Sequence, residues 1–125
     1  MDTQALLNAY HASRNGTDHY YRHPLSRRFL YSDGIKEMAE AGCYWLVDLL
    51  ATELPDQFRK RPQYDSCVVT FTVKDTEGRF RGDFEDGDKT PWRRKIDYTD
   101  MPDGTFKFFV GRNGEDLVAI LLSEY

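Results

Sequence analysis

Residues 25–54 read LSRRFLYSDGIKEMAEAGCYWLVDLLATEL, and this stretch decides the fold. From Asp33 onward its apolar residues recur at intervals of three and four, the spacing of a helix that buries one face. They are Ile35, Met38, Ala39, Gly42, Trp45, Leu46, Leu49 and Leu50. Ser32 or Asp33 can cap the first turn, because a side-chain oxygen there accepts from unpaired backbone N–H groups. Pro55 predicts that the helix ends at Leu54.

Gly42 lies at the centre of this helical pattern. Glycine costs about 1 kcal/mol relative to alanine inside a helix, yet the apolar spacing keeps its phase across this position. A continuous helix and two helices with a tight break both fit the pattern. We favour the break, because Ala41, Gly42 and Cys43 form a poor helical centre. The stretch predicts a core element and contains no catalytic motif.

The composition is that of one globular domain over residues 1–125. Hydrophobic residues make up 40% of the chain and aromatic residues 14%, so we expect an aromatic-rich core. The formal charge is −4, with eight basic and eight acidic groups in residues 1–64, and nine basic and thirteen acidic groups in residues 65–125. An acidic balance argues against non-specific nucleic-acid binding. The chain has no signal-peptide pattern and no run of about 20 apolar residues, so it predicts a soluble intracellular protein.

The two cysteines, Cys43 and Cys67, lie far apart in the sequence. They form no CxxC pattern and no disulfide framework of the kind found in small secreted domains. We therefore expect buried thiols that pack as small hydrophobic side chains.

Two short helices are expected before the central one. Residues 2–12 place Leu6, Leu7 and Tyr10 on one side, and residues 18–23 can form a further short helix before Pro24. The segment after Pro24 should send three apolar side chains to the core: Leu25, Phe29 and Leu30. The helical part is thus residues 1–54, and residues 55–64 form an exposed connector rich in proline and basic residues.

From residue 65 onward the period of the pattern changes from 3.6 to 2, which predicts strands. The expected strands cover residues 65–73, 79–85, 92–98, 105–110 and 117–122, and the turns between them are short. The last of these strands is apolar on both faces, so we expect it to be central or covered. Strands joined by turns of a few residues pair antiparallel. The sequence therefore predicts an α+β fold in which N-terminal helices pack on an antiparallel β-meander of about five strands in residues 65–125.

Three stretches resemble an uncharacterised bacterial family of small proteins. Residues 21–50 resemble the family's W/Y-R-H…R-x-x-x-Y-T-D-G-V-x-x-L-A-E…A-Y-W-L-x-D, residues 96–102 resemble a Y-T-D-F-P segment, and residues 121–125 resemble an L-L-P-S-E-Y ending. The chain departs from the family in a shorter segment at 41–43 and in the missing proline before Ser123.

This resemblance implies the fold and a setting on phage, plasmid or other mobile DNA in bacteria, and hence a cytoplasmic location in a bacterial host. The family is known only as a domain of unknown function. It has no established catalytic residues, so none can be transferred to this chain. Its place in the family pattern suggests that the Ser-Glu-Tyr ending is tied down in the sheet.

Three histidines, His11, His19 and His23, lie within thirteen residues. A helix would place His19 and His23 on one face, four residues apart, which is a spacing that metal ligands use. Since no HExxH pattern follows and Pro24 crowds the second histidine, we interpret the three as surface or capping side chains and expect no metal and no cofactor.

Acidic side chains gather at the start of the central helix, namely Asp33, Glu37 and Glu40. There they favour the positive end of the helix dipole, which is a structural role. An enzymatic site would have to use Tyr31, Asp33, His23 and Arg27, and we rank this hypothesis last because no nucleophile elbow, phosphate loop or dinucleotide fingerprint occurs.

Charged clusters lie in the strand region and in the connector. The acidic run around one hairpin is Asp83, Glu85, Asp86 and Asp88, and the basic clusters are Arg59, Lys60 and Arg61 with Arg93, Arg94 and Lys95. The acidic run is a solvated turn, whose acids pair with the following basic residues across the hairpin, or a surface that imitates phosphate. The basic clusters, with aromatic neighbours, can hold a nucleic-acid strand if they form one patch.

The sequence leaves a binding protein as the leading hypothesis. We expect a small non-enzymatic protein of a mobile element that binds a host protein, in its specific version an anti-defence inhibitor of the anti-CRISPR type, with the acidic and basic clusters as the partner-binding residues. The alternative is a nucleic-acid-binding accessory protein that uses the basic clusters. The sequence does not determine the oligomeric state, although an edge strand can pair across a dimer axis.

Overall fold

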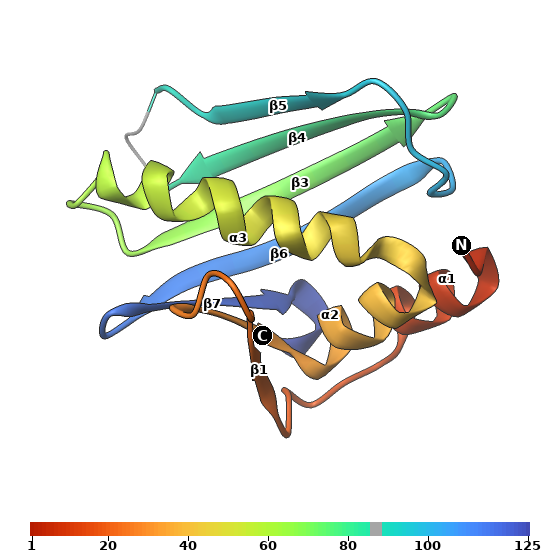
Figure 1. Cartoon of the computed structure of the whole chain (residues 1–125), viewed down its shortest axis with the longest axis horizontal. Helices are drawn as coiled ribbons and strands as arrows, with labels where there is room; N and C mark the ends of the chain where they lie inside the picture. The colour runs from red at the N-terminus through yellow and green to blue at the C-terminus, as the bar shows by residue number, and fades with distance from the viewer. Residues whose placement is uncertain (86–88) are drawn as a thin grey trace.

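One mixed sheet of seven strands organises the chain, and helix α3 lies across it (Figure 1). The structure is a computed structural model that describes residues 1–85 and 89–125. Its first half contains α1 (Thr3–His11), β1 (Tyr20–Arg22), β2 (Phe29–Ser32), α2 (Asp33–Met38), the π-helical turn η1 (Ala39–Cys43) and α3 (Tyr44–Arg59). Its second half contains β3 (Ser66–Lys74), β4 (Glu77–Phe84), β5 (Trp92–Ile96), β6 (Gly104–Asn113), β7 (Asp116–Leu121) and the 3-10 turn η2 (Leu122–Glu124). The α+β class is thereby confirmed.

The strand order is β1-β2-β7-β6-β3-β4-β5, and it differs from the predicted meander. The strands number seven, and β2 pairs with β7 in parallel while all other neighbours are antiparallel. After β5 the chain crosses the end of the sheet and inserts β6 between β7 and β3. In a meander β3 would be an edge strand with one row of backbone groups unpaired. β3 buries Val69 and Phe71 completely. Because β6 is inserted beside it, β3 has a hydrogen-bonded partner strand on each side.

The favoured break in the central helix is confirmed at Gly42. Its φ of 126° is a conformation that side-chain-bearing residues rarely adopt, so the chain turns between α2 and α3 at this residue. The predicted end at Leu54 is wrong, since α3 continues through Pro55 to Arg59. Proline removes one helical hydrogen bond. That loss is offset by the burial of Phe58, whose ring packs edge-on against Phe84 at 4.9 Å between centroids.

Three further predictions for the N-terminal half are wrong, and one of them concerns Leu30, which was expected in the core but is partly exposed. The expected helix at 18–23 is the strand β1, which pairs with β2 and places the rings of Tyr21 and Tyr31 5.8 Å apart. This cross-strand contact would be lost in a helix. Leu25 was expected in the core but is 90% exposed, because it lies in the loop between β1 and β2. The helix predicted at 2–12 is confirmed as α1.

Aromatic side chains fill the space between α3 and the sheet, as the composition predicted. The rings of Phe71 and Phe80 stack at 4.1 Å between centroids, and Trp45 of α3 packs edge-on against both. Cys43 and Cys67 are buried in this core and form no disulfide in the described part of the chain. Burial, with the nearby charge of Asp100, raises the pKa of the Cys43 thiol to about 12.

The C-terminal segment is fastened to the start of α2 by a buried carboxylate. Glu124 is 5% exposed and accepts hydrogen bonds from the Ser32 hydroxyl, from the Gly34 N–H at 3.0 Å and from the Leu121 N–H at 2.9 Å. Gly34 leaves room for this carboxylate, since a Cβ there would lie 2.9 Å from Glu124 Oε1. The expectation that this ending is tied down is therefore confirmed, and the partner is the turn into α2.

The turn between β3 and β4 is shorter than residues 74–78, which separate the two predicted strands. Lys74 and Glu77 are paired, so the turn consists of Asp75 and Thr76 alone, with φ values of 51° and 66°. Positive φ at both positions is the requirement of a type I′ hairpin turn, which favours Asn-Gly. A β-branched residue such as Thr76 is strained there.

Replacing Thr76 with glycine should raise the free energy of unfolding by about 1 kcal/mol, because glycine adopts positive φ without steric cost. Urea denaturation of both proteins measures the change. The same replacement at Thr72, in the extended strand β3, should lower stability, since glycine loses more backbone entropy there. A loss at Thr76 comparable to that at Thr72 would show that the turn is unstrained.

Candidate functional site

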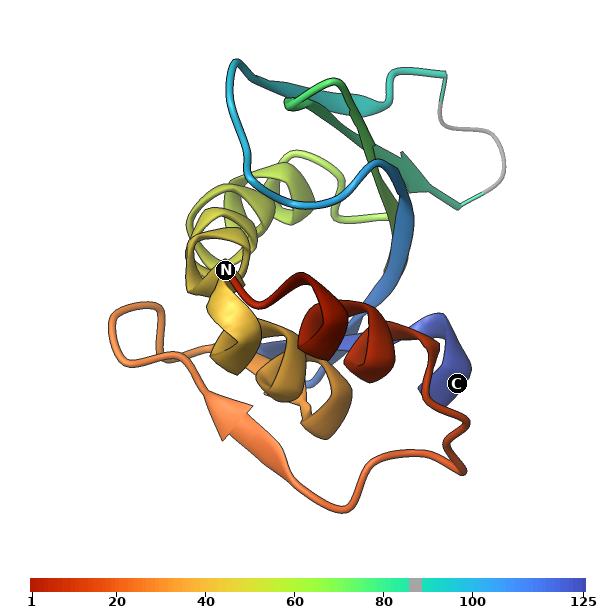
Figure 2. The ribbon, with the colours of Figure 1, turned by 90° about the vertical axis from the view of Figure 1, so that its right-hand side faces the viewer.

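The face of the sheet opposite α3 is its open face. Figure 2 shows α3 on one side of β3, β4 and β6, and in the described part of the chain no helix covers the other side of these strands. Side chains alternate along each strand, so the exposed positions of β4 (Arg79, Arg81 and Asp83) share the open face while Phe80 and Phe84 point to α3. The open face divides into a charged half and an apolar half.

The charged half consists of two cross-strand rows, which we call the cationic rows. The first row contains Arg93, Arg81, Thr70 and Lys107, and the second contains Lys95, Arg79, Thr72 and Thr105. Each row runs from β5 across β4 and β3 to β6. The strand register therefore brings together cations that lie up to 28 positions apart in the sequence.

Carboxylates neutralise part of this charge. Arg79 pairs with Glu77 at 2.7 Å and Arg81 with Asp83 at 2.9 Å. Lys95 lies 3.7 Å from Glu77, too far for a tight pair. Within residues 1–85 and 89–125, neither Arg93 nor Lys107 takes part in an ion pair, and both are exposed.

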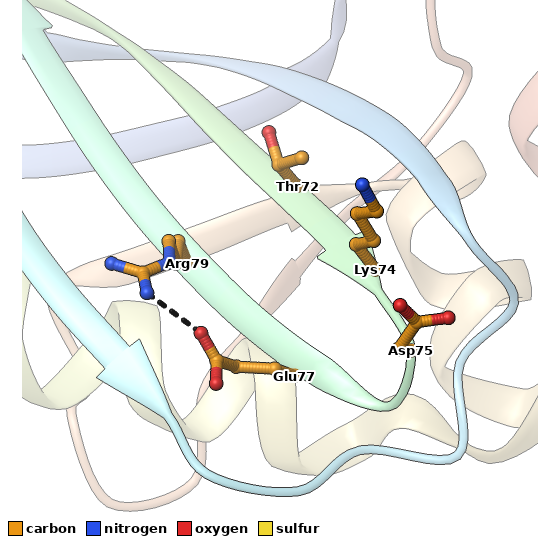
Figure 3. Close-up of a pocket in the computed structure, with 5 residues that line it drawn as sticks. All are labelled: Thr72, Lys74, Asp75, Glu77 and Arg79. Carbon is orange, nitrogen blue, oxygen red and sulfur yellow. Dashed lines mark hydrogen bonds and ion pairs between the residues drawn. The ribbon is translucent and has the colours of Figure 1, made fainter.

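Two shallow hollows follow the cationic rows. One, of about 490 Å³, is lined by Thr72, Lys74, Asp75, Glu77 and Arg79. Figure 3 shows its polar side chains on β3, on β4 and in the turn between them, with Arg79 reaching Glu77. The other, of about 430 Å³, lies between the short side chains of Thr70 and Thr72 and the long ones of Arg81 and Arg93. The first hollow holds two carboxylates beside its two cations, whereas the polar side chains of the second are hydroxyls and cations, so the second suits an anionic ligand.

The apolar half of the open face is a continuous patch. The register aligns Val68, Phe109 and Ile120 across β3, β6 and β7, and it aligns Val118 with Leu30 of β2. We call these five side chains the apolar patch; all are partly exposed. A hollow of about 300 Å³ lies over four of them.

Two tyrosines border the apolar patch. The ring of Tyr125, 82% exposed, packs edge-on against Phe109 at 5.0 Å between centroids. Tyr20, 53% exposed, lines the hollow beside Leu30 and Ile120. The patch is thus apolar at its centre and has amphipathic rings at its border.

The predicted basic clusters are divided between two faces. Arg93 and Lys95 lie in the cationic rows, but Arg94 points to the helical side, where its Nε is 3.4 Å from Glu53 Oε2 of α3. Strand alternation separates neighbours in this way. The basic residues after Pro55 end α3 and do not join the rows: Arg59 pairs with Asp56, Lys60 is the C-cap, and Arg61 donates to the Thr90 carbonyl.

The predicted acidic run is described only in part. Asp83 pairs with Arg81 of the same strand, and the Glu85 carboxylate accepts from the Asp65 N–H and the Ser66 hydroxyl. Asp86 and Asp88 lie outside the described residues. The expected pairing with 93–95 across the hairpin is not found among the described residues, where Arg94 and Lys95 have other carboxylate partners.

The three histidines do not share a helix face, because 18–23 is not helical. His11 ends α1, and His19 is exposed with its Nδ1 3.6 Å from Asp33 Oδ1. His23 is buried, so of the two interpretations, surface or capping, only the second fits this residue. Its Nδ1 accepts from the backbone N–H groups of Leu25 and Ser26, and its Nε2 donates to Asp48 at 2.8 Å. His23 therefore caps the turn after β1. No group of three metal-ligating side chains gathers in the described ranges.

The residues named for an enzymatic site have separate partners. The Asp33 carboxylate accepts from the backbone N–H groups of Asp18 and His19 and from the Tyr21 hydroxyl. Burial raises the pKa of Asp33, but these hydrogen bonds outweigh it and lower the pKa below its ordinary value. Burial raises the pKa of Tyr31. The ionised Asp33 carboxylate thus holds residues 17–21 against the start of α2.

His23 lines a hollow of about 670 Å³, but neither Asp33 nor Tyr31 lines it. Arg27, exposed in the neighbouring loop, accepts a hydrogen bond from Arg22 through its carbonyl oxygen. The four residues do not converge on one cavity.

The sequence interpretation missed Arg79, Arg81 and Lys107 and the apolar patch. Arg79 and Arg81 are two positions apart, as are Arg93 and Lys95, so alternation alone could have placed each pair on one face. That the two pairs are neighbours with Lys107 requires the strand order. The sequence does not give the order of the strands, and this order decides which residues share the open face.

The comparisons with known proteins give a family and no function. A family model described as a family of unknown function (DUF6876) matches residues 5–125. Neither a curated protein nor a solved structure matches the chain. None of the helices in the described part is long and apolar enough to cross a membrane.

Proposed function

Because the chain belongs to this family, whose function is unknown, we propose its function from the open face: it is a non-enzymatic binding protein that holds another protein against the apolar patch. The observation that carries the proposal is the patch itself, five partly exposed apolar side chains aligned across four strands. Contiguous apolar surface of this kind marks interaction sites on soluble proteins.

The border of the patch supports a protein as its occupant. Tyrosine is enriched at protein interfaces, because its ring supplies large contact area at a low cost in conformational entropy and its hydroxyl pairs with polar groups. Tyr20 lines the hollow over the patch, and Tyr125 packs against Phe109, which lines the same hollow, so both rings are placed to do this. An apolar centre with a polar border is the usual anatomy of an interface.

The specific version of the proposal is an anti-defence inhibitor that occupies a host defence protein, as anti-CRISPR proteins do. Its support is the mobile-element setting that the family resemblance implies, together with the lack of a convergent catalytic cluster among the residues named above. Expression of the protein in a bacterium with an active CRISPR defence should restore the uptake of a targeted plasmid. Unchanged plasmid loss across several defence types would remove this version and leave the general one.

Val118→Lys with Ile120→Lys should abolish capture of the protein partner, because two charges would enter the centre of the patch. The experiment is a quantitative pull-down from nuclease-treated bacterial lysate, with Thr72→Lys and Thr105→Lys as the control. The control adds the same charges on the same face, outside the patch. Partners should fall at least tenfold with the patch variant and remain with the control. Equal recovery by both variants would contradict the proposal.

The cationic rows favour a second candidate, nucleic-acid binding, on a separate part of the same face.

A further inference from the structure

We propose that the cationic rows bind the sugar-phosphate backbone of a single-stranded nucleic acid. The phosphate-binding cations lie beside the apolar patch, whose Phe109 borders them, and the site does not depend on a protein partner. It differs from the basic clusters of the sequence, since the Arg94 guanidinium points to Glu53, residues 59–61 do not join the rows, and cations of β4 and β6 are included.

The charge of the molecule is polarised between its two faces. Residues 33–59, which form α2, η1 and α3, carry six acidic and two basic side chains, a net charge of −4. The open face carries the opposite sign over the rows. Its cations are Lys74, Arg79, Arg81, Arg93, Lys95 and Lys107, and the carboxylates beside them are Asp75, Glu77, Asp83 and Asp97. A local excess of cations on a chain of net charge −4 is complementary to a polyanion.

The two cations without a carboxylate partner among the described residues favour the binding of phosphate groups. Arg93 and Lys107 have no carboxylate partner among the described residues, so a phosphate replaces only water around them. Thr70 and Thr72 lie between the rims formed by these side chains and supply hydroxyl donors to phosphate oxygens. Arginine also binds phosphate through two parallel N–H groups.

The shape of the site selects a single strand. The threonines form the floor of a shallow trough that runs across β3, and its hollow of about 430 Å³ is open to solvent. A broad sheet face cannot enter the grooves of a duplex, which admit a helix or a two-stranded ribbon. Phe109, next to Lys107 on β6, and the exposed ring of Tyr125 provide surfaces on which unpaired bases can stack. A single strand that lies along the trough brings its bases to these rings.

The test is fluorescence polarisation of labelled 20-nucleotide oligo-dT and oligo-U against a duplex of the same length, at several salt concentrations. The native protein should bind the single strands more tightly than the duplex, and its affinity should fall with salt. Arg93→Gln with Lys107→Gln should weaken binding at least tenfold. It should also reduce the slope of log affinity against log salt by about 1.4, since each single-strand phosphate contact contributes about 0.7.

The control variant is Arg27→Gln with Lys60→Gln, which removes two exposed positive charges away from the open face. It should leave both affinity and salt slope unchanged. Because neither Arg93 nor Lys107 forms an ion pair among the described residues, the test variant should retain the native urea midpoint. Absence of binding at low salt, a preference for the duplex, or equal losses in test and control variants would each overturn the proposal.

Failure of the protein-binding proposal would leave the nucleic-acid proposal standing, because a different variant tests each. Val118→Lys with Ile120→Lys adds positive charge beside the rows, so it should not weaken oligonucleotide binding even where it abolishes protein capture. A loss of oligonucleotide binding in this variant comparable to that of Arg93→Gln with Lys107→Gln would contradict a site in the cationic rows.

Discussion

Replacing Glu124 with glutamine should lower the free energy of unfolding by about 2–3 kcal/mol. The carboxylate accepts three hydrogen bonds, from the Ser32 hydroxyl and from the N–H groups of Gly34 and Leu121. Glutamine keeps the shape but presents an NH2 group to one of these donors, which leaves a buried N–H or hydroxyl unpaired. Unpaired buried polar groups cost more than the average hydrogen bond contributes.

Urea denaturation measures the effect, and Glu115→Gln is the matched control. Glu115 directly precedes β7 and forms an exposed ion pair with Arg28, a type of contact that contributes less than about 1 kcal/mol. If Glu124→Gln destabilised the protein no more than Glu115→Gln, the buried carboxylate would not be what holds the C-terminal segment to α2.

Replacing Gly78 with alanine should lower the free energy of unfolding by about 2–3 kcal/mol. A Cβ at this position would lie 2.5 Å from the ring of Phe71, closer than real contacts allow. The ring cannot move away, because it is fully buried between Phe80 and Trp45. The conflict would therefore distort the packing of the sheet against α3.

A double-mutant cycle identifies the cause. Phe71→Leu removes the atoms that meet the new methyl group, so the double variant with Gly78→Ala should lose less stability than the sum of the two single variants. Gly111→Ala in β6 is the control, since its nearest neighbour is the partly exposed ring of Phe109 at 3.2 Å, which has room to move. Additive losses for Phe71→Leu and Gly78→Ala would show that the ring is not the obstacle.

The open face presents two chemically different halves that can be tested one at a time. The apolar patch depends on β2, β6 and β7 with Val68 of β3, whereas the cationic rows depend on β3 to β6. The substituted side chains are exposed or partly exposed, so we expect variants in one half to leave the strand pairing of the other unchanged. Protein capture and oligonucleotide binding therefore measure separate properties of one surface, and the two proposals stand or fall independently.

The amino-acid sequence by itself determined most of the secondary structure, because these features depend on neighbours a few positions away. The apolar spacing in residues 33–54 predicts a helix, and Gly42 predicts its break, since only glycine adopts the required φ at low cost. Alternation from Ser66 predicts the strands of the second half. Pro55 was misjudged because the local preference of proline was outweighed by the tertiary burial of Phe58.

The tertiary structure alone decided the order of the strands and the composition of the candidate site. β6 lies beside β3, and β7 pairs in parallel with β2. An apolar strand is most stable with a hydrogen-bonded partner on each side, and strands from any part of the chain can be that partner. Ser32 and Glu124 meet across 92 positions, a contact that no local pattern encodes. Arg81, Arg93 and Lys107 become neighbours for the same reason. Side-chain alternation assigns each residue to a face, but only long-range backbone pairing brings the residues of one face together.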